Sequence, residues 1–214
     1  MINIVKRSSN LIVWCLAYSL FVYMAFHTSL VQQGRCFDEY LQVSLFSVQK
    51  YFFDVSIWFL AFLYIMKKPF VSPMFVARCK ETYLIHILLY GFKICLFYIM
   101  LTFILFWGIP FIAGVDIQIN ARLLFKMFNL FSFLLSTYLF YIFILLLTGK
   151  QMLAVLSGFC INSAILIIYF LFRWTFSELL ANQIENLLLS WYSAIAIMFM
   201  TIIFFVFRRK DFLL

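Results

Sequence analysis

Residues 11–31, which read LIVWCLAYSLFVYMAFHTSLV, decide the fold class of this chain, because the whole stretch contains no charged side chain. A helix needs about 20 consecutive apolar residues to cross the hydrocarbon core of a bilayer. The apolar residues run on without alternating with polar ones, which favours a membrane-spanning helix over a barrel strand. Lys6 and Arg7 precede the stretch, as in a signal peptide, but its length and the lack of a small-residue cleavage motif predict a retained helix.

The same pattern recurs along the rest of the chain. Five further apolar stretches cover residues 45–66, 83–107, 123–147, 152–172 and 189–207. Hydrophobic residues make up 67% of the sequence and charged residues 11%, against about 45–50% and about 25% in soluble domains. We therefore expect an all-α integral membrane protein, with a single transmembrane domain over residues 1–214 and six membrane-spanning helices.

The basic residues predict how these helices are oriented. If the N-terminus is cytoplasmic, ten Lys and Arg residues fall in cytoplasmic segments and five in outside segments. Short cytoplasmic loops carry the excess of positive charge in membrane proteins. An even number of spans then places both termini in the cytoplasm, in a cell (plasma) membrane whose anionic lipid is a natural partner. Because the charges flank apolar stretches, we expect no nucleic-acid partner.

Several enzyme classes are excluded by motifs that the sequence lacks. The two histidines, His27 and His86, are too far apart for an HExxH metal site, and no CxxC spacing or GxSxG turn occurs. The segment Gly149 to Gln151 contains a Gly-Lys pair but lacks the rest of a P-loop. We therefore expect no catalytic, cofactor or metal site in this chain, and any ATP and Mg to be bound by a partner ATPase. The five cysteines are expected to be packing residues: Cys15, Cys36, Cys79, Cys95 and Cys160.

Four charged residues fall inside the apolar stretches, Lys50, Asp54, Lys93 and Lys126, and of these Asp54 and Lys93 are the main exceptions at depth. Asp54 lies 13 residues before Lys67, and Lys93 lies 12 residues after Glu81. If Lys67 and Glu81 mark the same membrane face, both charges stand roughly 18–20 Å from it. Charges at this depth need a partner, so an Asp54–Lys93 ion pair or a shared polar cavity is predicted. In the alternative, Lys50 pairs with Asp54 four residues on, and Lys93 reaches an interface.

The connection between the second and third stretches predicts a short cytoplasmic helix. Pro69 ends the preceding helix, and Ser72 before Pro73 is a good N-cap with proline at the first helical position. The helix would carry Met74, Phe75, Val76, Arg78 and Lys80. Such an amphipathic segment either fills a groove of a partner protein or lies on lipid headgroups.

Two outside segments are also apolar. Thr175 and Glu178 form a T-x-x-E capping box. One face of the helix that follows would carry Leu180, Ile184, Leu187 and Leu188. This segment is either a short external amphipathic helix or the ordinary start of a long sixth span. Residues 108–122 are expected to lie flat on the outer interface.

Together, these features resemble the permease subunit of a six-span ABC exporter of the type V (second-class) kind. The resemblance rests on the six spans, the basic loop 69–80, the capped segment 175–188 and the basic tail 207–211. It implies that residues 72–80 form a coupling helix on a cytoplasmic ATPase subunit, and that residues 175–188 form an external gate. It also implies a homodimer or heterodimer of permeases that exports an amphipathic or peptide-like substrate, as in small bacterial members linked to peptide export or self-immunity.

Two other interpretations remain open. The chain could be a non-transporting immunity or assembly protein that binds a partner in the bilayer. It could also belong to another membrane class, such as a vitamin-uptake substrate-binding subunit or an embedded enzyme.

Overall fold

The computed structural model describes residues 2–32, 36–66, 80–115, 121–175, 192 and 194–203, and these ranges are helical with no strand. Several helices contain π-helical turns, denoted η. In chain order the elements are α1 (Ile2–Phe26), η1 (His27–Gln32), α2 (Phe37–Leu41), η2 (Gln42–Phe46), η3 (Lys50–Val55), α3 (Ser56–Ile65), α5 (Lys80–Ile112), α6 (Ala121–Thr148) and α7 (Gln151–Thr175). A further short helix covers Ala194–Ile203.

Four of these helices are long and apolar enough to cross a membrane. They cover Ser9–Gln32, Ile85–Ile112, Leu123–Thr148 and Gln151–Leu171. A fifth crossing is formed if the bent pair Phe37–Phe46 and Lys50–Ile65 counts as one span. The expected all-helical, multi-pass membrane fold is therefore confirmed for four or five crossings. The sixth expected span is described only over Ala194–Ile203, which is shorter than a full crossing.

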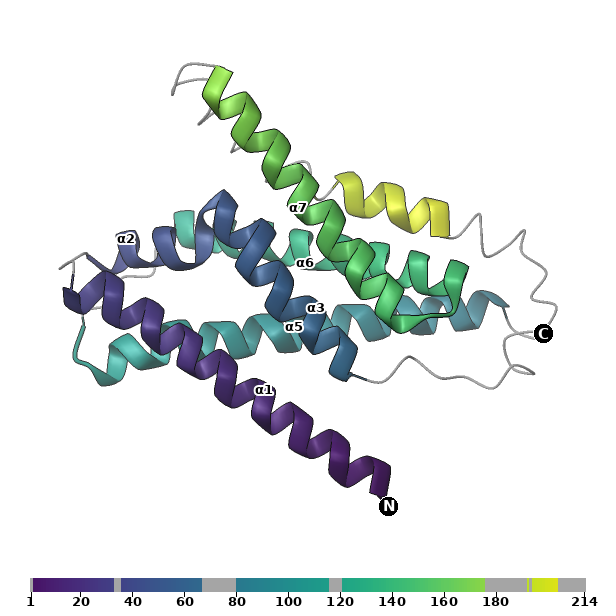
Figure 1. Cartoon of the computed structure of the whole chain (residues 1–214), viewed down its shortest axis with the longest axis horizontal. Coiled ribbons are helices and arrows are strands. Elements are labelled where there is room, and N and C mark those ends of the chain that lie inside the picture. Colours follow the sequence, from purple (N-terminus) through teal and green to yellow (C-terminus); the bar gives the residue numbers. More distant parts are fainter. Residues whose placement is uncertain are drawn as a thin grey trace.

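Helix α3 lies at the centre of the bundle. It packs against α1, α6 and α7, while α5 lies between α1 and α6 (Figure 1). The buried side of α3 is aromatic: Phe59 and Phe62 are fully enclosed. The ring of Phe62 lies 5.0 Å from Trp14 of α1 and 5.8 Å from Tyr98 of α5. Aromatic packing thus joins the three helices around one core.

Two sets of side-chain contacts define the two ends of the bundle. At one end, Gln151 of α7 donates hydrogen bonds from Nε2 to the carbonyls of Leu63 (3.3 Å) and Tyr64 (2.8 Å), where α3 ends. At the other end, the ring of Phe37 lies 5.8 Å from Trp107 near the end of α5. These are called the Gln151 end and the Phe37 end below.

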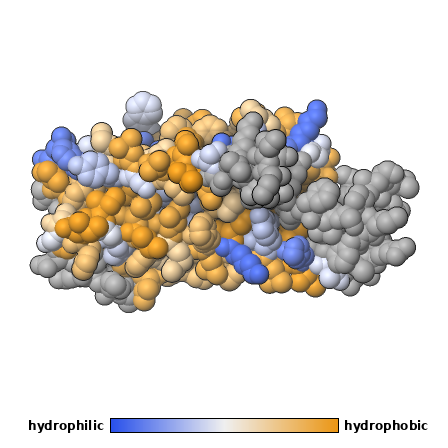
Figure 2. All heavy atoms as spheres, turned by 90° about the horizontal axis from the view of Figure 1, so that it is seen from below, coloured by the Kyte–Doolittle hydropathy of each residue, from blue (hydrophilic) through white to orange (hydrophobic). Residues whose placement is uncertain are grey.

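The outer surface is apolar and several interior positions are polar. Large hydrophobic side chains are more than half exposed on each long helix, for example Leu16, Met100, Phe128 and Ile167. Figure 2 shows such residues spread over the middle of the visible face. The buried polar residues include Ser56, Thr102, Asn129, Ser132, Ser136, Thr137 and Asn162. Exposed apolar and buried polar side chains are what a lipid environment requires.

Close packing between α5 and α6 depends on a glycine. A Cβ atom at position 91 would overlap the ring of Tyr138, which is buried against the backbone of α5. The hydroxyl of Tyr138 donates a hydrogen bond to the carbonyl of Ile87 at 3.0 Å. Small residues allow this kind of close helix approach in membranes, so Gly91 fixes the spacing of the two helices.

The expectation that residues 108–122 lie flat on an interface is wrong for their first part. Helix α5 continues through Gly108 and Pro110 to Ile112. Helix α5 ends two residues before Gly114, which has φ +75°. A glycine in this left-handed conformation commonly follows the end of a helix.

Candidate functional site at a broken helix

The second apolar stretch is broken rather than continuous. The arms Phe37–Phe46 and Lys50–Ile65 meet at an angle of 52°. Ser47 between them has extended backbone angles, φ −77° and ψ 151°. Its side chain helps to restart the helix, because Ser47 Oγ accepts a hydrogen bond from the N–H of Lys50 at 3.4 Å. Both arms carry π-helical turns next to the break, a feature often found at functional sites.

One residue of α6 contacts both arms of the broken helix. The Nζ of Lys126 donates a hydrogen bond to Oε1 of Gln42 in the first arm. The backbone carbonyl of Lys126 accepts a hydrogen bond from the hydroxyl of Tyr51 in the second arm at 3.2 Å. The same Nζ lies 5.5 Å from the ring centre of Phe46, within range of a cation–π interaction. Lys126 therefore holds the two arms at their observed angle.

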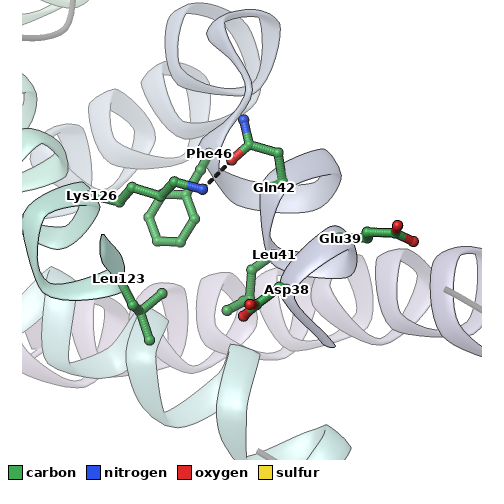
Figure 3. Close-up of a pocket in the computed structure, with 7 residues that line it drawn as sticks. All are labelled: Asp38, Glu39, Leu41, Gln42, Phe46, Leu123 and Lys126. Atoms are coloured by element: carbon green, nitrogen blue, oxygen red, sulfur yellow. Dashed lines mark hydrogen bonds between the residues drawn. The ribbon is translucent and has the colours of Figure 1, made fainter. Parts of the chain in front are cut away.

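A cavity of about 220 Å³ opens beside Lys126. Its lining residues are Asp38, Glu39, Leu41, Gln42, Phe46, Leu123 and Lys126. Figure 3 shows the Lys126 side chain reaching across to Gln42, while the Glu39 carboxylate points away from this contact. The cavity thus has a cation on its α6 side and two exposed carboxylates on the α2 side. It can receive a small ligand that carries both a polar group and an apolar part.

Asp54 is paired within its own helix. Its Oδ2 lies 2.6 Å from Nζ of Lys50, four residues earlier. The Lys50 Nζ also lies 6.0 Å from the ring centre of Phe21 in α1. Lys93 is exposed on α5. The structure therefore contains the alternative ion pair, Lys50–Asp54, and not the predicted Asp54–Lys93 pair.

The register between α3 and α5 explains this correction. Ring contacts place Phe59 level with Tyr98 (5.1 Å) and Phe62 level with Phe97 (6.0 Å). Because the two helices run in opposite directions, Asp54 is level with residues 103–105. Lys93 is at least ten residues, or about 15 Å, away along the helix axis. Counting depth from Lys67 and Glu81 assumed that the neighbouring ends of the two helices are level, but α5 begins well beyond the last residue of α3.

A second polar contact lies deeper in the bundle. The amide of Asn162 in α7 donates a hydrogen bond to Ser56 Oγ at 2.7 Å and a longer one to Thr137 Oγ1 at 3.5 Å. All three residues are buried. Asn162 therefore joins α7 to the second arm of the broken helix and to α6 through interhelical hydrogen bonds.

Most of the other predicted site residues lie outside the described residues. This applies to Ser72, Pro73, Met74, Phe75, Val76 and Arg78 of the proposed coupling helix, and to Glu178, Leu180, Ile184 and Leu187 of the proposed external gate. Lys80 begins α5 and Thr175 ends α7 as backbone positions. The coupling helix and the gate therefore stay predictions.

The site residues that sequence reasoning missed are Gln42, Tyr51, Lys126 and Asn162. Gln42 lies between the first two expected spans, and Lys126 is one of the five basic residues that the orientation argument assigns to outside segments. A polar Asn inside an apolar span was a usable signal, because such residues usually bond to a neighbouring helix. Tyr51 gave no such signal, since its position is typical of an ordinary buried aromatic residue.

Among the described residues, no group of three or more His, Cys, Asp or Glu side chains could hold a metal ion. The described cysteines Cys15, Cys36, Cys95 and Cys160 are free thiols. Irregular backbone at membrane depth occurs where it is buried in protein or lines a cavity, and here it does both.

Comparison of the chain with protein-family models, curated proteins and solved structures finds no match in any of the three.

Proposed function

We propose that this chain is the transmembrane subunit of an ATP-driven exporter of the ABC type, working with a separate ATPase subunit. The observation that carries the proposal is the broken second helix, whose two arms are both tied to Lys126. Transporters commonly place broken helices beside their substrate sites, because the break supplies a joint and exposes polar groups.

The charges around the break support a binding role. Lys50 and Asp54 neutralise each other beside the joint, and Lys126 faces the cavity that contains Asp38 and Glu39. An unpaired charge inside a membrane costs about 2.5–3.5 kcal/mol on insertion scales, and the side chains of Lys50, Asp54 and Lys126 beside the break all have partners. The cavity suits an amphipathic or peptide-like substrate.

The proposed energy source is a separate ATPase. The chain lacks a P-loop, so ATP and Mg bind to the partner ATPase. In this proposal, residues 72–80 dock on the ATPase, and its closure moves α3 and α5 as a lever. The break beside Lys126 then changes angle, and a route opens toward residues 175–188. Such a mechanism requires two arrangements with different partner contacts. A second permease copy, identical or related, completes the route.

Co-purification tests this function. The tagged chain is extracted from its native membrane in mild detergent, and bound proteins are identified by mass spectrometry. The proposal expects a P-loop ATPase in comparable amount, which is lost in the double variant Met74→Asp, Phe75→Asp. The matched control is Ile112→Asp, Ala113→Asp at the Phe37 end of the bundle, which should retain the ATPase. Absence of any ATPase from the wild-type preparation contradicts the proposal.

A second candidate function is favoured by a different observation. An apolar groove of about 540 Å³ lies between α3 and α7, and such a surface suits a protein that acts by holding a partner in the bilayer. This is the non-transporting immunity or assembly role. The same purification distinguishes it, because the chain would then retain a membrane protein and no ATPase.

A further inference from the structure

A small cavity lies between α6, α7 and the short helix Ala194–Ile203, and it is called the Asn162 cavity below. Its volume is about 70 Å³. Its polar lining residues are Ser136 and Thr137 of α6, Asn162 of α7, and Tyr192 just before the last helix. The other lining residues are isoleucine, phenylalanine and glycine. Polar and apolar side chains therefore share one enclosed space.

The cavity lies deep in the membrane-spanning part of the bundle. Thr137 and Asn162 are close to the middle of the spans Leu123–Thr148 and Gln151–Leu171. At a rise of 1.5 Å per residue, both stand about 13 Å or more from either end of their span. Lipid offers no hydrogen-bond partner at this depth, so the polar groups around the cavity depend on what the protein holds inside.

Two atoms of the lining residues have no protein partner. The amide nitrogen of Asn162 donates to Ser56 Oγ at 2.7 Å and to Thr137 Oγ1 at 3.5 Å, but Asn162 Oδ1 accepts no hydrogen bond from the described residues. The hydroxyl of Tyr192 has no partner in that part of the chain either. Asn162 is only 5% exposed and Tyr192 4%. Buried polar atoms are almost always hydrogen-bonded, because leaving them unpaired costs free energy.

The Tyr192 ring is held from two sides. Its centre lies 5.6 Å from the ring centre of Phe52 in the second arm of the broken helix and 5.1 Å from that of Phe133 in α6. These contacts fix the residue that carries the unpaired hydroxyl. The lining of the cavity is therefore built before any ligand binds.

The size and charge of the cavity restrict its ligand. A water molecule takes up about 30 Å³ in the liquid, so the cavity has room for about two of them and is too small for a peptide-like molecule or a lipid. No charged residue is among the described lining residues, so the site offers nothing to neutralise an ion. A buried water molecule typically makes about three hydrogen bonds, and the four polar side chains around the cavity can supply them.

We propose that the Asn162 cavity is a binding site for water, in which the bound molecules donate to Asn162 Oδ1 and bond to the Tyr192 hydroxyl. Water at this point would join the last helix to α6 and α7 through hydrogen bonds as well as through packing. The site does not depend on the proposed transport function, because it needs only the packing of these three helices.

X-ray footprinting of the full chain in detergent micelles tests the proposal. A short synchrotron pulse splits water into hydroxyl radicals, including water bound inside a protein, and the radicals oxidise the side chains that they meet first. Oxidised residues are located by mass spectrometry. Tyr192 should be oxidised although it is buried, whereas Phe59 and Phe62, which are fully enclosed and do not line this cavity, should not be.

Variants show whether the radicals come from the cavity. Asn162→Leu removes the acceptor and Ser136→Leu fills the space, so each should abolish oxidation of Tyr192. Ser56→Ala breaks the hydrogen bond from Asn162 but leaves its Oδ1 in place, so the oxidation should persist. Asn129→Leu, which replaces a buried asparagine outside the cavity, should also leave it unchanged. Circular dichroism checks that each variant is folded.

Two outcomes overturn the proposal. If Tyr192 in the wild-type protein is oxidised no faster than Phe59 and Phe62, the cavity is dry. If oxidation of Tyr192 persists in folded Asn162→Leu or in folded Ser136→Leu, the radicals reach Tyr192 from elsewhere and the cavity is not the water site.

Discussion

The Nζ of Lys50 lies 2.6 Å from Oδ2 of Asp54, so the two charges nearest the break neutralise each other along one helix. Asp54→Asn should leave the Lys50 cation half-buried and unpaired. We expect a loss of about 1–3 kcal/mol in the free energy of unfolding, measured by SDS titration in mixed micelles. The double variant Lys50→Met, Asp54→Leu should recover most of this loss.

Lys93→Gln is the control for this pair, because Lys93 is exposed on α5. It should change stability by less than about 0.5 kcal/mol, and its effect should add to that of Asp54→Asn. A strong coupling energy between positions 54 and 93 would contradict this expectation and support the Asp54–Lys93 ion pair that the sequence predicted.

The hydrogen bond from Asn162 to Ser56 links α7 to the second arm of the broken helix. Asn162→Leu should cost about 1 kcal/mol, in line with interhelical hydrogen bonds in membranes. A double-mutant cycle with Ser56→Ala should give a coupling energy of similar size. Zero coupling would show that the two side chains do not interact in the folded protein.

Gly91 and Gly108 lie in the same helix but have different surroundings. A Cβ atom at position 91 would overlap the Tyr138 ring, whereas position 108 has nothing within 4 Å. Gly91→Ala should therefore destabilise the bundle by about 1–3 kcal/mol. Gly108→Ala should be neutral or should stabilise the helix, by up to about 1 kcal/mol. Thermal unfolding in detergent compares the two variants, and equal effects would contradict the close α5–α6 packing.

Thiol labelling tests the proposed orientation. Cys36 is exposed at the Phe37 end, and the orientation that the basic residues predict places this end outside. A membrane-impermeant maleimide should therefore label Cys36 in intact cells. In a chain with the native cysteines replaced, Lys150→Cys at the Gln151 end should react only after permeabilisation. The reversed labelling pattern would show that the protein has the opposite orientation in the membrane.

The sequence predicted the long uninterrupted helices well and the broken one badly. Residues 123–147 and 152–172 match α6 and α7 closely, because continuous apolar runs of this length have no other satisfied backbone structure in lipid. The break at Ser47 could not be predicted in this way. The two arms meet Lys126 through its contacts with Gln42 and Tyr51, and these contacts join residues 75 or more positions apart.

The prediction that Asp54 pairs with Lys93 was wrong for a related reason. Depth was counted along each helix from a shared membrane face, but the aromatic contacts of Phe59 and Phe62 with α5 set a different register. Hydropathy reports which residues lie in the membrane, and it does not report how far one helix slides past another. The local Lys50–Asp54 pair needed only the i, i+4 spacing of a helix.

The most direct test of this mechanism is the distance between the first arm of the broken helix and α6 in the complex with the ATPase. Spin labels are placed at Val43 in the first arm and Leu124 in α6, which are both exposed, in a chain whose native cysteines are replaced. Pulsed electron paramagnetic resonance compares the nucleotide-free complex with the complex trapped with ATP and vanadate. A moving broken helix would shift the 43–124 distance between two distinct populations, while the distance within α6 between the control positions Leu124 and Leu147 stays unchanged. An identical 43–124 distance in both states, in a complex that hydrolyses ATP, would contradict the claim that the broken helix is the moving element of an ATP-driven exporter.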